Sequence, residues 1–307
     1  MVWTPYPGQA VALNEADLNT VVSARGDISI QELWTSIENC RVRYLKCGQG
    51  DPLVLVHGLL GSSFCWRFNL RELGTVGTVY APDMPGMGYS GRIAERECSL
   101  RTSAERLLAF MTSCGIGRAD LLGSSHGGAV VMMAAAMAPT RVGRLLLAAP
   151  VHPWMRDSRL VLAAVASTPG RWLMRALAPQ LGNLHGYFLR RMYSDARRIA
   201  PGTLEGYSAP IRIAGTIDHL LAIVRRWRQD LQELRSVLPE LRSIPTLLIW
   251  GSKDTAVGPH SAIALHGVFE SCRLELIPDA GHLPFEETPS EFNARVSAFL
   301  NEQPLAL

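Results

Sequence analysis

Lysine is almost absent from this sequence. Lys46 and Lys253 are the only lysines, so nearly all of the 30 basic residues are arginines. Basic and acidic residues almost balance, and the net charge is only +3. A chain so close to neutrality has no general attraction for a polyanion, so we expect no nucleic-acid partner. The arginine bias itself is explained most simply by genomic composition.

The sequence also lacks paired cysteine motifs and long apolar runs. Its six cysteines are scattered without Cys-x-x-Cys spacing, so we expect reduced thiols and neither a disulfide framework nor a metal site. No apolar stretch approaches the roughly 18 residues that a membrane-spanning helix needs. The N-terminus shows no basic region followed by an apolar core, as a secretory signal would. We therefore expect a cytoplasmic protein with no membrane partner.

What the sequence does contain is an alternation of short apolar strands and helices. Its 307 residues, 48% of them hydrophobic, are ample for a buried core. Several apolar runs are continuous, which is typical of strands buried on both faces. The predicted fold class is therefore α/β, with a mostly parallel, doubly wound sheet. The expected strands cover residues 36–40, 41–46, 53–56, 78–81, 119–123, 142–149, 246–250 and 273–277.

The alternation stops between residues 151 and 243. This stretch has a mainly helical pattern broken by prolines, and it is too long and too apolar for a loop. It carries 14 arginines, no lysine and seven acidic residues, so it is the most basic part of the chain. We predict an inserted helical cap at 151–243, a core at 36–150 and 244–307, and an N-terminal extension at 1–35. The extension is expected to pack over the body, and a lid or dimer contact is an open alternative.

One stretch, residues 121–130, indicates the chemistry. It has the pattern of a strand, a tight turn and the start of a helix, with Gly123, Ser125 and Gly127 forming Gly-x-Ser-x-Gly. Such a turn brings the neighbours of the serine very close together. Glycine avoids the clash, so the serine can project its hydroxyl above the sheet. The helix that follows points its unpaired N–H groups at any charge that develops there.

The ends of the other predicted strands carry matching residues. Ligands of open α/β sheets bind outside the carboxyl ends of the strands, so these positions were the natural candidates. The run His57-Gly58-Leu59 follows the third strand, and Ser125 follows the fifth. Asp254 follows the seventh strand and His282 the eighth. A nucleophile, an acid and a histidine therefore occur in that order along the chain.

This arrangement resembles the α/β-hydrolase fold superfamily, in its capped, esterase-like branch. The resemblance covers roughly residues 36–300 and depends on five motifs that follow the family's order. They are His57-Gly58, Asp83-x-Pro85-Gly86-x-Gly88-x-Ser90, Gly123-x-Ser125-x-Gly127-Gly128, Trp250-Gly251-x-x-Asp254 and Gly281-His282-x-Pro284-x-x-Glu287-x-Pro289. The resemblance implies a catalytic triad of Ser125, Asp254 and His282. It also implies that neither a metal nor an organic cofactor is needed.

The chemistry gives each of these residues a role. A serine hydroxyl is a weak nucleophile at neutral pH and needs a base, for which His282 is suited because histidine titrates near that pH. Asp254 is expected to fix the imidazole tautomer and to stabilise the imidazolium. The backbone N–H groups of Leu59 and His126 are expected to form the oxyanion hole.

The remaining histidines and carboxylates receive lesser roles. His57 resembles the family's structural histidine beneath the oxyanion loop, and Asp83 resembles a structural turn residue. Asp279 lies only three residues from His282, which makes it a poor orienting partner, and Asp254 is therefore preferred as the acid. We expect surface or packing roles for four histidines, namely His185, His219, His260 and His266.

A substrate pocket is expected between the strand ends and the cap. Its candidate residues are Leu60, His152, Trp154, Tyr187, Phe188 and Leu283, and the side chain of His126 is a further candidate. For the aromatic residues of the cap, packing within the cap is the alternative. The arginine-rich helices leave an anionic substrate open as well, although a solvated helix surface explains these charges equally.

The serine at the elbow narrows the reaction. Epoxide hydrolases and haloalkane dehalogenases of this superfamily use a carboxylate there, whereas serine fits acyl transfer. We predict a serine hydrolase that cleaves carboxylic esters of small or medium hydrophobic acyl groups. Three alternatives stay open: a C–C bond hydrolase, a thioesterase or acyltransferase, and a receptor on a hydrolase fold with a vestigial triad. The expected partner is a small-molecule ester, and a homodimer is an open alternative.

Overall fold

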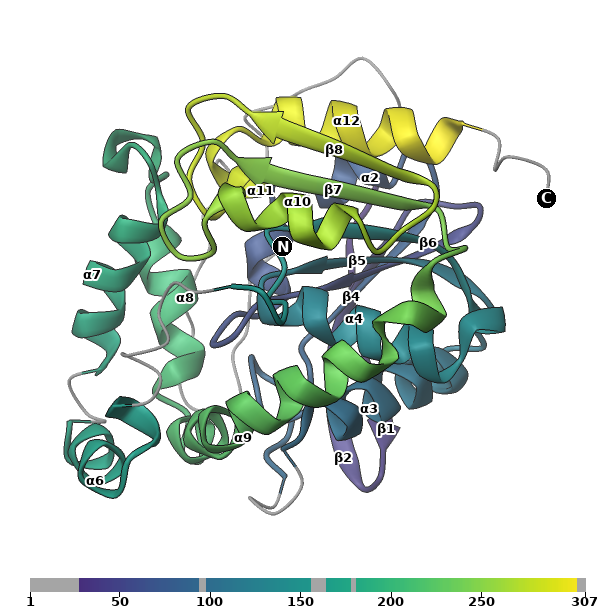
Figure 1. The fold of residues 1–307 in the computed structure, drawn as a ribbon. Coiled ribbons are helices and arrows are strands. Elements are labelled where there is room, and N and C mark those ends of the chain that lie inside the picture. The colour runs from purple at the N-terminus through teal and green to yellow at the C-terminus, as the bar shows by residue number, and fades with distance from the viewer. Residues whose placement is uncertain (1–27, 94–97, 156–163, 178–180, 303–307) are drawn as a thin grey trace.

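The structure, a computed structural model, describes residues 28–93, 98–155, 164–177 and 181–302. Its centre is an eight-stranded sheet in the order β1-β2-β4-β3-β5-β6-β7-β8 (Figure 1). The strand pairs β1–β2 and β2–β4 are antiparallel, and all other pairs are parallel. The strands are β1 (Gln31–Ile37), β2 (Cys40–Cys47), β3 (Pro52–Val56), β4 (Thr78–Pro82), β5 (Ala119–Ser124), β6 (Val142–Ala148), β7 (Thr246–Gly251) and β8 (Cys272–Ile277).

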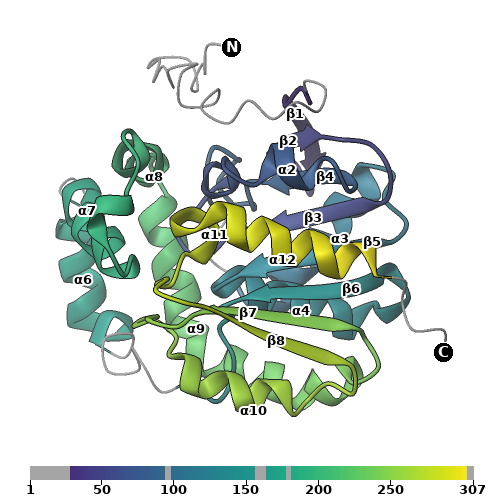
Figure 2. The same cartoon turned by 90° about the horizontal axis from the view of Figure 1, so that it is seen from above.

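Helices cover both faces of the sheet (Figure 2). One face carries α3 (Leu100–Ser113), α4 (His126–Met137) and α10 (Ala262–His266), and the other carries α2 (Leu70–Leu73) and α12 (Pro289–Asn301). Shorter elements are η1 (Ser63–Trp66), η2 (Pro139–Arg141), η5 (Leu238–Leu241), η6 (Pro259–Ser261) and α11 (Pro284–Glu287). The predicted fold class, a doubly wound and mostly parallel α/β sheet, is confirmed.

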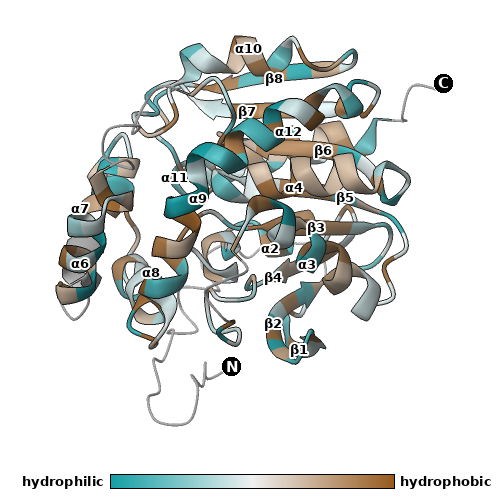
Figure 3. Cartoon of the chain, turned by 60° about the horizontal axis from the view of Figure 1, so that its bottom comes forward, coloured by the Kyte–Doolittle hydropathy of each residue, from teal (hydrophilic) through white to brown (hydrophobic). Residues whose placement is uncertain are grey.

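The two faces explain why the strands have continuous apolar runs. Alternate side chains of a strand point to opposite faces. In β3, Val54 and Val56 join the core under α3 and α4, whereas Leu53 and Leu55 join the core under α2 and α12. Both faces are buried, so every position of the strand must be apolar. The central strands and α4 are accordingly mainly hydrophobic (Figure 3).

The segment between β6 and β7 contains helices and is called the helical insertion below. Its described helices are α6 (Thr168–Ala176), α7 (Leu181–Met192), η4 (Ala196–Arg198), α8 (Thr203–Ile211) and α9 (Thr216–Val237). Helix α9 has a buried apolar face that includes Ile217, Leu220 and Val224, and it packs beside the sheet near α3 and α4. The proposed domain boundaries at 150 and 243 fall in the loops on either side.

The N-terminal part of the sheet differs from the sequence prediction. Strand β1 begins at Gln31, inside the segment assigned to an extension, and residues 1–27 of that extension lie outside the described residues. The predicted strand at 36–40 was wrong, because a two-residue turn at Glu38 and Asn39 interrupts it. Both residues have positive φ, as this type of hairpin turn requires, and Ile37 pairs with Cys40 across it.

No helix among the described residues is both long and apolar enough to cross a membrane.

Candidate active site

Ser125 occupies the turn between β5 and α4. Its φ of 53° and ψ of −121° lie in a region that residues other than glycine rarely adopt. The surrounding chain holds this conformation: the N–H of Ser125 donates to the carbonyl of Ala148 at 3.0 Å, and its carbonyl accepts from Val151 at 2.9 Å. Ser125 is partly exposed between buried neighbours. The strained turn therefore presents one hydroxyl at the carboxyl edge of the sheet.

Glycines make this turn sterically possible. A Cβ at Gly123 would overlap the main chain of Gly127 and Gly128, and a Cβ at Gly127 would overlap the carbonyl of Val56. These contacts are with main-chain atoms of packed elements, which cannot move aside cheaply. The spacing of the Gly-x-Ser-x-Gly motif therefore reflects close packing of the strand β5, the helix α4 and the end of β3.

His282 and Asp254 are hydrogen-bonded to each other. His282 Nδ1 lies 2.8 Å from Asp254 Oδ2, and both side chains are buried. The other oxygen, Asp254 Oδ1, accepts from the N–H groups of Ala256 at 2.8 Å and Val257 at 3.0 Å. A carboxylate held in this way is positioned to accept a hydrogen bond from Nδ1–H, which leaves Nε2 of the imidazole free to accept a proton.

The loop after β3 lies against Ser125. A Cβ placed on Gly58 would lie 3.2 Å from the Cβ of Ser125, so the two residues are in close contact. Among the described residues, nothing accepts a hydrogen bond from the backbone N–H of Leu59 or of His126. These donors are the two that the sequence predicts for an oxyanion hole. That assignment stays a prediction.

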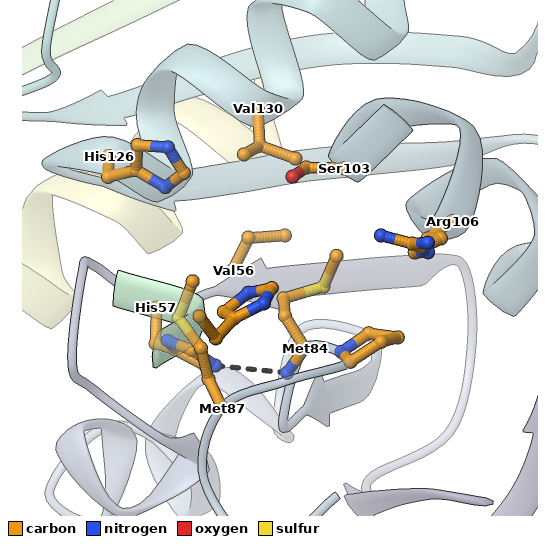
Figure 4. A pocket seen from close by; sticks show the side chains of 10 residues that line it. Val56, His57, Met84, Met87, Ser103, Arg106, His126 and Val130 are labelled. Carbon is orange, nitrogen blue, oxygen red and sulfur yellow. Dashed lines mark hydrogen bonds between the residues drawn. The ribbon is translucent and has the colours of Figure 1, made fainter. Parts of the chain in front are cut away.

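His57 shapes this loop. Its Nδ1 donates to the carbonyl of Gly58 at 2.8 Å, and its Nε2 accepts from the N–H of Met84 at 3.0 Å (Figure 4). Burial lowers the pKa of His57, so the ring is neutral at physiological pH and both nitrogens are used in these bonds. The arrangement agrees with a structural role for His57.

The hydroxyl of Ser125 forms no hydrogen bond with the described residues. The contact with His282 Nε2 that the predicted triad needs is therefore not closed in this structure. Catalytic hydrogen bonds are often long in ligand-free enzymes and shorten when substrate binds. The structure thus brings together two of the three predicted residues, His282 and Asp254, and presents the third at the same edge of the sheet.

The predicted pocket residues occupy different environments. Leu59 and Leu60 pack against the apolar cluster of α8 and α9 in the helical insertion, and Leu60 has a φ of 58°. Leu283 is buried in the core next to α12. The insertion therefore covers the predicted oxyanion loop with aliphatic side chains.

Four other pocket candidates lie elsewhere. His152 is fully buried, with Nε2 3.0 Å from Ser261 Oγ and Nδ1 accepting from the N–H of Trp154 at 3.3 Å. Both of its ring nitrogens are occupied within the core, and Trp154 packs beside it. Tyr187 and Phe188 are 56% and 48% exposed and contact each other. None of the four lines the pocket formed by His57, His126 and His219.

A small pocket lies between the end of β3, the start of α4 and α9 (Figure 4). Three histidines from separate elements meet at it: His57, His126 and His219. His126 also stacks on Trp227 of α9, with ring centroids 5.9 Å apart. The remaining lining is Val56, Met84, Pro85, Met87, Ser103, Arg106 and Val130. The side chain of His126 thus faces the junction of the core and α9.

Two of these histidines, His126 and His219, make the free energy of unfolding depend on pH. Burial lowers the pKa of both His126 and His219 to about 4. Between pH 6.5 and 4 an unfolded histidine binds a proton and these folded ones do not, so stability falls as the pH drops through this range. We expect the loss at pH 5 to be about 2 kcal/mol per histidine. His219→Gln should reduce the difference between urea unfolding free energies at pH 7 and pH 5, and an unchanged difference would contradict this assignment.

Two buried carboxylates lie shortly after His282 in the chain. No role was expected for Glu286 or Glu287 from the sequence, although Glu287 is part of the motif that begins at Gly281, and both side chains have no exposure. An acidic pair in a sequence usually indicates a solvated surface. Only their partners, which lie about 80 to 220 positions away along the chain, reveal that they are internal.

Comparisons with known proteins agree with this architecture. A model of the α/β hydrolase fold family matches residues 51–289. The dihydrolipoyllysine-residue acetyltransferase component of the acetoin cleaving system of Pseudomonas putida is 32% identical over 263 residues, which cover 82% of this chain and 64% of that protein. This chain therefore spans less than two thirds of the length of that relative.

Two further proteins match over most of their length. The 2-hydroxymuconate semialdehyde hydrolase of Pseudomonas sp. strain CF600 is 27% identical over 267 residues, covering 84% of this chain and 90% of that protein. The crystal structure of Cfl2 from Burkholderia cenocepacia superposes with a TM-score of 0.81 at 21% identity, covering 89% of this chain and 96% of the other. At this identity the likeness shows a common fold.

Proposed function

Because the chain belongs to the α/β-hydrolase fold family, we propose that it is a serine hydrolase that cleaves carboxylic esters through an acyl-enzyme on Ser125. The observation that carries the proposal is the buried hydrogen bond between His282 Nδ1 and Asp254 Oδ2, at the sheet edge where Ser125 is presented. Structural ion pairs of this kind exist elsewhere in proteins. Here the pair and a strained serine both follow strands of one parallel sheet, and a serine with a base and an orienting acid is the combination that nucleophilic catalysis requires.

The proposed reaction has two halves. In the first, His282 Nε2 takes the proton of Ser125 while Oγ attacks the ester carbonyl, and the N–H groups of Leu59 and His126 hold the resulting oxyanion. The C–O bond then breaks, and the leaving alcohol receives the proton from His282. In the second half, water gives a proton to His282 and attacks the acyl-enzyme, which releases the acid and restores Ser125.

The surroundings favour a hydrophobic ester. Leu59 and Leu60 lie against Ile217, Leu220 and Val224 of the helical insertion, so the space next to the oxyanion loop is bordered by aliphatic groups. Burying apolar atoms there is favourable by about 25 cal/mol per Å². We therefore propose small or medium hydrophobic acyl groups.

Two other reactions remain candidates because of specific relatives. The relative named a 2-hydroxymuconate semialdehyde hydrolase favours C–C bond hydrolysis, and the relative named an acetyltransferase component favours transfer of an acyl group to an acceptor other than water. Both reactions would also use an activated serine. The nature of the electrophile therefore distinguishes the candidates, and the triad geometry does not.

A substrate panel tests the proposal. The purified protein is assayed with p-nitrophenyl esters of two to twelve carbons, with a pantetheine thioester, and with a vinylogous 1,5-diketone acid. We expect turnover of the shorter esters and a transient mass increase equal to the acyl group on the peptide that contains Ser125. Turnover of the diketone alone would replace the proposal with C–C hydrolysis. Product that appears only with an added thiol or alcohol acceptor would replace it with acyl transfer.

A further inference from the structure

A buried carboxylate joins the core to the helical insertion beside His282. Glu286 receives two hydrogen bonds from the guanidinium of Arg67, at 2.7 Å and 2.9 Å. It receives two more from the hydroxyls of Tyr193 and Tyr207, the latter at 2.6 Å. Arg67 follows η1 in the core, whereas both tyrosines belong to the insertion. All four acceptor positions of this carboxylate are therefore used, two from each side of the junction.

The negative charge of Glu286 is paired with the positive charge of the Arg67 guanidinium. The Arg67 guanidinium is also bonded to Thr203 Oγ1 at 2.8 Å, and it lies over the rings of Phe64 and Phe68 at 4.1 Å and 4.2 Å. Burial and the charge of Glu286 raise the pKa of Tyr193 and of Tyr207, so both hydroxyls stay protonated and donate. A buried charge with this many partners holds its neighbours in one arrangement.

The next residue forms a second link. Glu287 Oε2 accepts from the N–H of Gly281 at 2.7 Å, and its Oε1 accepts from the N–H of Asp195 in the insertion at 3.0 Å. Moreover, the N–H of His282 itself donates to the carbonyl of Met192 at 2.7 Å. The main chain that carries the imidazole is thus bonded directly to the end of α7.

We propose that Glu286 is a positioning residue for His282: by fixing Tyr193 and Tyr207 it keeps the end of α7 against the histidine loop. The inference builds on the proposed function, because it assumes that His282 is the base. Its consequence is that the junction from Met192 to Tyr207 acts as part of the active-site frame. An opening motion at this junction would carry His282 away from Ser125, so any opening for substrate must involve other parts of the insertion.

The most conservative test removes the hydroxyls of Tyr193 and Tyr207 and keeps their aromatic rings. In the double variant Tyr193→Phe/Tyr207→Phe, the charge pair of Glu286 with Arg67 remains, but the two hydrogen bonds from the insertion to Glu286 are lost. We expect kcat for p-nitrophenyl esters to fall about 100-fold with KM within about twofold, because small misplacement of a catalytic group has an effect of this size. Tyr80→Phe, at a buried tyrosine of β4, is the matched control and should keep the wild-type kcat.

A second readout does not depend on turnover. The proton between His282 Nδ1 and Asp254 should give a downfield NMR signal in the wild-type protein, and we expect this signal to broaden or exchange faster with water in the double variant. Restoring either tyrosine should recover part of both the signal and kcat. A variant with an unchanged signal and unchanged kcat but a lower urea midpoint would overturn the inference, because the network would then only stabilise the fold. A wild type without esterase activity would refute the proposed function, and the NMR comparison would still decide this inference.

Discussion

Replacing Ser125 with alanine is expected to lower ester turnover by a factor on the order of 10⁶, to the level of the uncatalysed reaction plus the contribution of binding. The substitution removes the proposed nucleophile, and the neighbouring hydroxyl of Ser124 is buried at the end of β5. Alanine retains the Cβ and meets the same backbone conformation, so the fold should be kept. Initial rates with a p-nitrophenyl ester, together with the mass of the protein after mixing, measure both effects.

The control for this experiment is one residue away. Ser124→Ala also removes a hydroxyl, but from a buried position at the end of β5. We expect this variant to keep its rate within a few-fold of the wild type. If Ser125→Ala still turned over esters at the wild-type rate, or still gained the mass of an acyl group, the nucleophile would have to be another residue.

The fold was predictable because the pattern of apolar residues in each strand indicates which of its faces are buried. Continuous apolar runs occur at residues 53–56 of β3, 145–148 of β6 and 247–250 of β7. A strand segment covered on both faces favours apolar residues at successive positions, so these runs predict helices on both sides of the sheet. The hairpin of β1 and β2 shows the limit: its turn at Glu38 and Asn39 looks polar and ordinary in sequence, and its register follows from positive φ angles that no propensity fixes.

The candidate site was predictable for a related reason. Ser125, Asp254 and His282 each follow a strand, and parallel strands place these ends at one edge. A residue that directly follows a strand in the sequence is therefore predicted to lie at this edge of the sheet. Their glycine neighbours carry an additional signal, because Gly123 and Gly127 stand where any Cβ would overlap main-chain atoms.

The pocket could not be predicted in this way. Helices of the insertion are not ordered by a sheet, so an aromatic residue on them can face the site, the core or the solvent. Tyr187 and Phe188 are about half exposed. Tyr193, which directly follows the end of α7, is instead buried and donates a hydrogen bond to Glu286. The residues that bind the insertion to the histidine loop are separated by about 90 positions, and no local pattern links them.

The second large expected effect is the loss of activity when Asp254, the proposed acid of the triad, is replaced. Asp254→Asn is expected to lower kcat about 10⁴-fold, because the asparagine side chain presents an N–H to the imidazole in place of a carboxylate. The ring would then carry its proton on Nε2, where it cannot accept the proton of Ser125. The amide oxygen can still accept from Ala256 and Val257, so the local turn should remain folded. Urea unfolding of the variant checks that the loss is chemical.

A neighbouring carboxylate provides the matched control. Asp279 lies three residues before His282, is exposed, and pairs with Lys253 at 2.6 Å. Its φ of 53° is well tolerated by asparagine, so Asp279→Asn changes the charge without straining the loop. We expect this variant to keep its kcat within about twofold, since surface ion pairs contribute little. A large loss in Asp279→Asn with little loss in Asp254→Asn would assign the orienting carboxylate to the other side of the loop. The buried bond of 2.8 Å to Asp254 argues for the opposite result.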